Sequence, residues 1–272
     1  MTKAIYTHRW QPPEDVSVQT HGIYLLHGTG EHAARYDAFA NRLTAQGFRV
    51  GAHDHPGHGR SKGKRGLIDP PGSLATQAAL QIQKFAWETD SQPILFGHSL
   101  GGSLATELVL QHHLPVAGLI LSAPALMPIM RASDKVKLKL LSIVAPTLCL
   151  DLGSDPSRLT HDASVMAKAS SDALNHSYKS ATLVNWLISS GRQSLERAEQ
   201  INVKTLLLIA GADPIIDSAQ TQAFARRIDS DLLTVHEYEG YFHELLNETP
   251  ERRERVMLDI DHWLESFKLA KD

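Results

Sequence analysis

Six short runs of mostly apolar residues are spaced along the chain, and most of them end in residues that favour turns. They cover residues 23–26, 50–53, 94–96, 117–121, 206–209 and 233–236. The runs are apolar along their length rather than at alternate positions, which is typical of strands buried on both faces of a parallel sheet. We therefore expect six parallel strands.

Helical patterns separate most of these runs. Leu100, Leu104 and Leu108 recur at every fourth position, and a second apolar stripe lies near the C-terminus. That stripe consists of Val256, Ile260, Trp263, Leu264 and Phe267. Strands that alternate with helices predict right-handed βαβ units and a mostly parallel, doubly wound α/β sheet. The turn-rich residues 11–15, between two short extended stretches, predict an antiparallel hairpin at its edge.

One segment, from about residue 126 to residue 191, breaks this rhythm. Its pattern is helical and partly basic, as in the stretch KVKLKLL at 135–141. Because it lies between the fourth and fifth expected parallel strands, we interpret it as an insertion rather than a separate domain. We expect an α/β core made of residues 1–125 and 192–272, and an inserted helical cap at 126–191.

Composition adds a few exclusions. The chain has 272 residues, 42% of them hydrophobic and 21% charged, which is ordinary for a soluble globular protein. A net charge of −3 gives no reason to expect nucleic acid as a partner. Cys149 is the one cysteine, so no intramolecular disulfide can form. The first sixteen residues have no signal-like apolar core and no run could span a bilayer, so we expect a cytoplasmic protein.

The motif G-x-S-x-G, which can mark a nucleophilic serine, occurs at Ser99 and again at Ser61. The motif alone is weak, but its context separates the two serines. Ser99 follows the strand at 94–96 and opens the helix at 100–110, which is the strand–turn–helix setting of a nucleophile elbow. Ser61 lies in a basic, glycine-rich loop with no helix after it. We predict that Ser99 is the nucleophile.

A serine nucleophile needs a base, and the base needs an acid to orient it. In this architecture the order along the chain is serine, acid, histidine. His243 follows the last strand and is the predicted base, because His236 belongs to that strand and His262 to the terminal helix. Asp213 follows the strand at 206–209 and is the predicted acid. Its neighbour Asp217 suits the N-cap of a helix that begins near residue 218.

The reaction also needs N–H donors for the oxyanion that develops on the substrate. We predict Thr29, in the loop after the first parallel strand, and Leu100, the residue after the nucleophile. The histidines at 53, 55 and 58 beside Asp54 resemble a metal site, but we interpret that stretch as structural. We expect no metal and no cofactor.

These segments together resemble the monoacylglycerol lipase and lysophospholipase-like family of α/β hydrolases. The matching stretches are residues 27–32 (HGTGEH) with 35–36 (RY), 54–61 (DHPGHGRS), 97–102 (GHSLGG), 211–213 (GAD) and 243–248 (HELLNE). The resemblance implies an α/β-hydrolase fold with an inserted cap. It also implies a cofactor-free esterase that cleaves one acyl chain from glycerol or a glycerophosphodiester. By position, Ser99, Asp213 and His243 match the family triad, and Thr29 and Leu100 match its oxyanion residues.

The cap matches the family less clearly, which leaves the substrate open. Monoacylglycerol hydrolysis is the leading hypothesis, and a lysophospholipase or a short- to medium-chain carboxylesterase is the alternative. Acyl transfer and a non-catalytic binding module are further alternatives. For residues 136–144, where lysine alternates with apolar residues, an amphipathic helix packed on the core and a patch that touches membranes or micelles both fit. The sequence leaves the oligomeric state open.

Overall fold

The computed structural model describes residues 4–153 and 155–268 of the chain. Residues 1–3, which belong to the stretch predicted to have no signal-like apolar core, lie outside the described residues. Residue 154 of the expected cap and residues 269–272 of the expected core lie outside them as well.

Within the described residues, seven strands form one sheet in the order β1-β3-β2-β4-β5-β8-β9. The strands are β1 (Thr7–Trp10), β2 (Ile23–Leu26), β3 (Val50–His53), β4 (Ile94–His98), β5 (Gly118–Ser122), β8 (Thr205–Ala210) and β9 (Leu233–Tyr238). Strands β2 to β9 of this sheet are parallel, as predicted, and β1 is antiparallel to β3. Leu26 at the end of β2 lies opposite Gly97 of β4, so the loops after these strands meet at one edge of the sheet.

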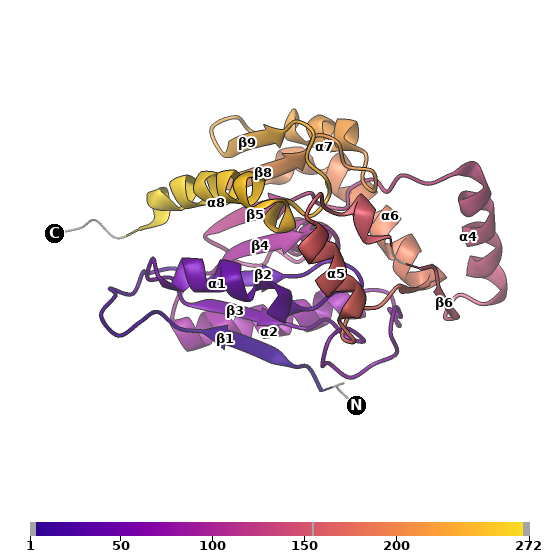
Figure 1. Cartoon of the computed structure of the whole chain (residues 1–272), viewed down its shortest axis with the longest axis horizontal. Coiled ribbons are helices and arrows are strands. Elements are labelled where there is room, and N and C mark those ends of the chain that lie inside the picture. The colour runs from indigo at the N-terminus through magenta and orange to yellow at the C-terminus, as the bar shows by residue number, and fades with distance from the viewer. Residues whose placement is uncertain (1–3, 154, 269–272) are drawn as a thin grey trace.

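Helices cover both faces of the sheet (Figure 1). Helices α1 (Asp37–Thr44) and α8 (Pro250–Leu264) contribute to one buried apolar cluster. Helices α2 (Ser73–Thr89), α3 (Leu100–Leu110), α6 (Ala181–Glu196) and α7 (Ser218–Ala225) contribute to the cluster on the other face. Short 3₁₀ helices are η1 (Ala33–Tyr36), η2 (Pro156–Arg158), η3 (Ala198–Gln200), η4 (Leu245–Asn247) and η5 (Glu265–Phe267). The predicted α/β architecture with a mostly parallel sheet is therefore confirmed.

The predicted hairpin at the N-terminus is wrong in one respect. β1 is an antiparallel edge strand, but it pairs with β3, with Thr7 opposite His53 and Trp10 opposite Val50. The described residues 11–22 contain no strand. The partner of β1 comes from forty residues further along the chain, which a local pattern of turn residues could not reveal.

The insertion between β5 and β8, which we call the cap, contains α4 (Ala132–Val144), α5 (Ala163–Ser171) and the first part of α6. It also contains a two-stranded antiparallel sheet of β6 (Cys149–Asp151) and β7 (Tyr178–Ser180), which the expectation of a helical cap missed. The boundary expected at 191 falls inside α6. Gly191 lets α6 pack closely against the chain after β5, because a Cβ at this position would collide with the backbone of Leu126.

Helix α4 stands away from the sheet at the side of the molecule (Figure 1). None of its residues is buried, while Leu138, Leu141 and Ser142 are half-buried. Of the two interpretations of residues 136–144, a helix packed on the core and a patch that touches lipid, the exposed apolar side favours the second. Helix α4 is joined to α6, where the amide of Asn185 donates a hydrogen bond of 2.8 Å to the Ser142 hydroxyl of α4. Among the described residues, no helix is both long enough and apolar enough to cross a membrane.

Candidate active site

Ser99 lies on the turn between β4 and α3, with backbone angles of φ 52° and ψ −117°. A non-glycine residue in so sparsely populated a conformation costs about 1–3 kcal/mol, which the surrounding packing must offset. A Cβ at Gly97 would collide with the backbone of Gly101, and a Cβ at Gly101 with the carbonyl of Leu26. Both flanking positions therefore require glycine, and the predicted strand–turn–helix setting of Ser99 is what the structure contains.

Asp213 and His243 come from loops after β8 and β9 and meet as a buried pair. The Nδ1–H of His243 donates to Oδ2 of Asp213 at 2.6 Å. The other oxygen, Oδ1, accepts the backbone N–H groups of Ile215 at 2.8 Å and Ile216 at 3.0 Å. With Nδ1 donating to the carboxylate, Nε2 is left as the acceptor on the imidazole. Asp217 instead caps α7 by accepting the Ala219 N–H at 3.0 Å.

The two groups shift each other's pKa values. Burial alone would lower the pKa of His243, but the charge and hydrogen bond of Asp213 outweigh it, so the pKa is raised above its ordinary value. Burial would raise the pKa of Asp213, but His243 and the two backbone N–H groups lower it below its ordinary value. The pair therefore favours an ionised carboxylate and stabilises an imidazolium when one forms.

The loop after β2 lies directly against the nucleophile turn. A Cβ built on Gly28 would stand 3.3 Å from Cβ of Ser99 and 3.2 Å from Cδ2 of His98. Thr29 follows Gly28 and lines the same cavity as Ser99. Leu100 is the first residue of α3, so its N–H has no acceptor inside the helix. Both predicted N–H donors therefore lie close to Ser99. Leu100 is its neighbour in the chain, and Thr29 belongs to the loop that packs against the Ser99 turn.

The second serine motif has a structural role. The Ser61 hydroxyl donates to the carbonyl of Asp54 at 2.6 Å and accepts the Tyr6 N–H at 2.8 Å. The Asp54 carboxylate accepts the backbone N–H groups of Ala33 at 2.9 Å and Arg60 at 2.8 Å. These bonds fix the 54–61 loop beside η1. Ser61 therefore holds the loop and does not line the cavity at Ser99.

The neighbouring histidines form hydrogen bonds among themselves. His55 Nδ1 lies 3.1 Å from His53 Nε2, and Tyr24 Oη lies 3.1 Å from His53 Nδ1. Burial lowers the pKa of His53 to about 3, so its ring is neutral at pH 7. In the part of the chain that the structure describes, no group of three or more His, Cys, Asp or Glu side chains is arranged to hold a metal ion.

A cavity of about 480 Å³ opens onto Ser99 and His243 beneath the cap. The ring of His98 lies against that of His243, with centroids 4.9 Å apart and the ring planes tilted by 52°. The apolar part of the lining includes Ala125, Pro128, Leu159, Leu187, Ile215 and Ile216. The charged part of the lining has four cationic side chains, Arg35 and Arg65 from the core and Arg158 and Lys179 from the cap, and five acidic ones, Glu31, Asp151, Asp155, Asp172 and Glu244. The cavity is therefore suited to an amphiphile.

A buried ion-pair network also lies at this site, and none of its residues was predicted to have a role. Arg35 donates to Glu31 at 2.5 Å and to both oxygens of Glu244 at 3.0 and 2.6 Å. Tyr36 also donates to Glu31, at 2.8 Å. Glu31, Arg35 and Tyr36 lie within the HGTGEH and RY stretches quoted above, which was the only signal. Glu244 is 209 residues from Arg35, so no local pattern could have paired them.

Comparison with known proteins shows the family to which the chain belongs. The family described as serine aminopeptidase, S33 (Hydrolase_4) matches residues 19–250. A monoacylglycerol lipase of Mycolicibacterium smegmatis is 30% identical, over 94% of this chain and 91% of that protein. The phospholipase YtpA of Bacillus subtilis is 29% identical, over 90% of this chain and 94% of its own length. An abhydrolase domain-containing protein of Dictyostelium discoideum is 31% identical over 92% of this chain, which spans only 27% of that longer protein.

A solved structure gives the same result. The crystal structure of a Paleococcus ferrophilus monoacylglycerol lipase superposes with a TM-score of 0.86 and is 29% identical in sequence, covering 97% of this chain and all of that one. The family match covers most of the chain. The chain belongs to the Hydrolase_4 family and is a serine ester hydrolase of the α/β-hydrolase fold, similar to monoglyceride lipases.

Proposed function

We propose that this protein hydrolyses monoacylglycerols, with Ser99 as nucleophile, His243 as base and Asp213 as the acid that orients it. The observation that carries the proposal is the buried His243–Asp213 bond of 2.6 Å, in loops that converge on the strained Ser99 turn. A hydroxyl on such a turn is exposed to a substrate in the cavity, and the imidazole supplies the base that it needs.

The reaction proceeds through an acyl-enzyme. Nε2 of His243 takes the Ser99 proton while Oγ bonds to the ester carbon, and the carbonyl oxygen becomes an oxyanion. The N–H groups of Thr29 and Leu100 donate to that oxyanion. The intermediate then collapses, the C–O bond to glycerol breaks, and glycerol leaves with the proton from His243. Water repeats the sequence on the acyl-enzyme, which releases the fatty acid and regenerates Ser99.

The first experiment is a substrate panel run with the wild type and Ser99→Ala. It contains p-nitrophenyl esters, monoacylglycerols of several chain lengths, lysophosphatidylcholine, lysophosphatidylglycerol and an aminoacyl p-nitroanilide. We expect hydrolysis of long-chain monoacylglycerol that falls by about 10⁴-fold or more in the variant, since the nucleophile is lost. Peptide mapping after reaction with a fluorophosphonate should place the label on Ser99 and not on Ser61.

Other outcomes would contradict parts of this proposal. Turnover of short esters alone would contradict the lipid substrate while keeping the triad. Hydrolysis of the anilide alone would replace ester cleavage with aminopeptidase activity. Ester products that appear only with added glycerol would replace hydrolysis with acyl transfer.

A second candidate substrate is a lysophospholipid. Four cationic side chains line the cavity. Arg35 is paired with Glu31 and Glu244, whereas Arg65, Arg158 and Lys179 form no ion pair with any described residue. The charge of Arg158 repels that of Lys179. Burial, followed by that repulsion, lowers the pKa of the Lys179 ammonium. An anionic head group in the cavity would relieve this repulsion. In the panel, a higher kcat/KM for lysophosphatidylglycerol than for monoacylglycerol with the same acyl chain would favour this substrate.

Helix α4 supports a further part of the proposal, which is brief contact between the cap and a lipid surface. Its apolar side chains are strongly exposed, with Val136 at 69%, Leu140 at 62%, Ile143 at 74% and Val144 at 72%. These positions recur at helical spacing and form one stripe beside several lysines. Such a helix binds lipid interfaces through its apolar face and anionic lipids through its lysines.

A further inference from the structure

The peptide between Gly28 and Thr29 carries the N–H that we propose as one oxyanion donor. Its carbonyl oxygen, on Gly28, accepts a hydrogen bond of 2.8 Å from Nδ1 of His27. The peptide is planar and trans, so its N–H points away from its C=O. A side chain that fixes the direction of the Gly28 carbonyl therefore also fixes the direction of the Thr29 N–H.

The tautomer of His27 is set by a second contact. The backbone N–H of His55 donates to Nε2 of His27 at 2.9 Å, so Nε2 is an acceptor and Nδ1 bears the proton. In return, Nε2 of His55 lies 3.0 Å from the carbonyl oxygen of His27. Burial, with a contribution from nearby histidines, lowers the pKa of His27 well below its ordinary value. The ring is thus a neutral donor with one fixed orientation.

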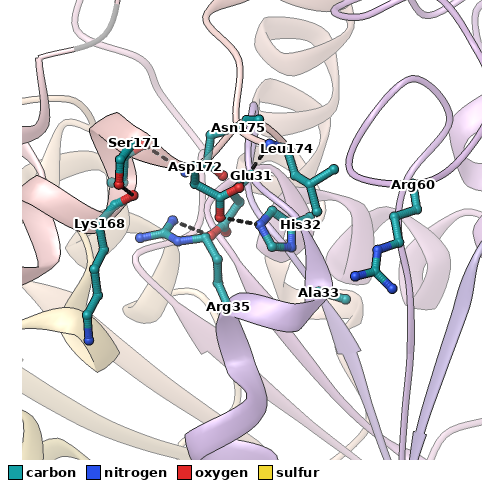
Figure 2. Close-up of polar contacts among 12 residues, drawn as sticks. Glu31, His32, Ala33, Arg35, Arg60, Lys168, Ser171, Asp172, Leu174 and Asn175 are labelled. Atoms are coloured by element: carbon teal, nitrogen blue, oxygen red, sulfur yellow. Dashed lines mark hydrogen bonds and ion pairs between the residues drawn. The ribbon is translucent and has the colours of Figure 1, made fainter.

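Glu31 holds the same loop from the other side. Its Oε1 accepts the Gly28 N–H at 2.5 Å, and its Oε2 accepts from Arg35 at 2.5 Å. Figure 2 shows Glu31 and Arg35 together, beside the ion pair between His32 and Asp172 of the cap. Burial would raise the pKa of Glu31, but the charges of Arg35 and His98 and the hydrogen bonds from Gly28 and Tyr36 together outweigh it, so the pKa is lowered. The acceptor for the Gly28 N–H therefore stays ionised.

Arg35 extends this hold to the loop of the base. The same guanidinium binds Glu244 through two hydrogen bonds, and Glu244 is adjacent to His243 in sequence. Its side chain is 12% exposed, and those of Glu31 and Glu244 are 7% and 6% exposed, so solvent screens the network little. The loop of the oxyanion donor and the loop of the base share one cation.

We propose that His27 and Glu31 are positioning residues that aim the Thr29 N–H at the oxyanion, and that Arg35 keeps this peptide in register with the His243 loop. The proposal rests on the proposed function, because it takes Thr29 as a donor. The side chains of His27 and Glu31 act through the backbone and touch no reacting atom.

The test compares His27→Leu, which removes the donor, with His27→Asn, whose amide N–H can replace Nδ1–H. Glu31→Gln replaces the charged acceptor of the Gly28 N–H with a neutral one. We expect kcat to fall about 10- to 100-fold in His27→Leu and Glu31→Gln, with KM within about twofold, and partial recovery in His27→Asn. The inhibition constant of a trifluoromethyl ketone should rise by the same factor as kcat falls. The affinity of a non-hydrolysable ether analogue should not change.

Arg42→Gln is the matched control, because Arg42 forms ion pairs with Asp261 and Glu254 between α1 and α8, away from the cavity. Wild-type kcat in folded His27→Leu and Glu31→Gln would overturn the proposal. Equal losses for the ketone and the ether analogue would also overturn it, because they indicate general distortion of the site. Full activity of Ser99→Ala would overturn the proposed function and this inference together. If Ser99→Ala is inactive but His27→Leu and Glu31→Gln are fully active, only the inference is overturned.

Discussion

The catalytic edge of the sheet and the cap are built in different ways. At the sheet edge the polar groups are buried and paired, so that Asp213 accepts from His243 and two backbone N–H groups at once. In the cap, α4 buries no residue, and Arg158, which lines the cavity, donates to the backbone carbonyl of Pro214 and forms no ion pair with any described residue. Polar groups that are buried and hydrogen-bonded to one another hold a site in one geometry. A charged side chain without an ionic partner is instead free to bind a ligand. We therefore expect changes at the sheet edge to affect kcat and changes in the cap to affect KM and substrate preference.

The sharpest test of this comparison contrasts two aspartates that lie four residues apart. Asp213→Asn removes the charge that orients His243, so kcat should fall by about 10³- to 10⁴-fold with little change in KM. Asp217→Asn keeps an N-cap residue on α7 and should stay within about threefold of wild type. Steady-state kinetics on one ester substrate measures both. Similar losses in the two variants would contradict the assignment of Asp213 as the acid.

The pH dependence tests the same pair with a different readout. His243 must be unprotonated to act as base, so kcat/KM should rise with pH through the pKa of this residue. Because Asp213 raises that pKa, the midpoint should lie above the ordinary histidine value of about 6.5. In Asp213→Asn, the midpoint of the residual activity should move to lower pH. A midpoint that does not move would mean that the titrating group is not coupled to Asp213.

In the cap, Lys179→Met removes a charge from the cavity and keeps the length of the side chain. We expect the ratio of kcat/KM for lysophosphatidylglycerol to kcat/KM for monoacylglycerol to fall about tenfold, mostly through KM, because an ion pair with the head group is lost. Lys84→Met on the exposed surface of α2 is the control and should leave the ratio unchanged. An unchanged ratio in Lys179→Met would remove the support for an anionic head group.

The smallest effect is expected at α4. Ile143→Ser should weaken binding to anionic vesicles a few-fold, since one exposed apolar side chain is lost from the lipid-facing stripe. The free energy of unfolding should change by less than about 0.5 kcal/mol, because Ile143 is 74% exposed. Vesicle sedimentation and denaturant unfolding measure these two quantities. Trp87→Ser is the control, because Trp87 is 83% exposed on α2, and loss of vesicle binding in this variant instead would place the contact elsewhere.

Much of the fold was readable from local sequence. The predicted helix at 100–110 has the bounds that the structure gives to α3, and the six predicted parallel strands all occur. Strands buried on both faces need continuous apolar residues, and such runs stand out in a sequence. Strand β1 could not be paired correctly, and β6 and β7 were not predicted. Their partners are distant in the chain, and their short sequences carry no period of their own.

The candidate site likewise has features that local sequence predicts and features that depend on the tertiary structure. The sequence by itself determined which serine sits on a strand–turn–helix unit and which acidic residue and histidine follow the later strands, because apolar runs and turn residues are local features of the chain. Glycine at 97 is also a local need, since a Cβ there would meet the Gly101 backbone, whereas glycine at 101 is needed because the Leu26 carbonyl of β2 lies against it. Only the tertiary structure brings Arg35 to Glu244 and places Lys179 and Arg158 on the lining of one cavity. Local chain geometry determines which residues can occupy a turn. Electrostatic interactions depend on distance in space, and residues far apart in the chain become neighbours only when the sheet and the cap have assembled.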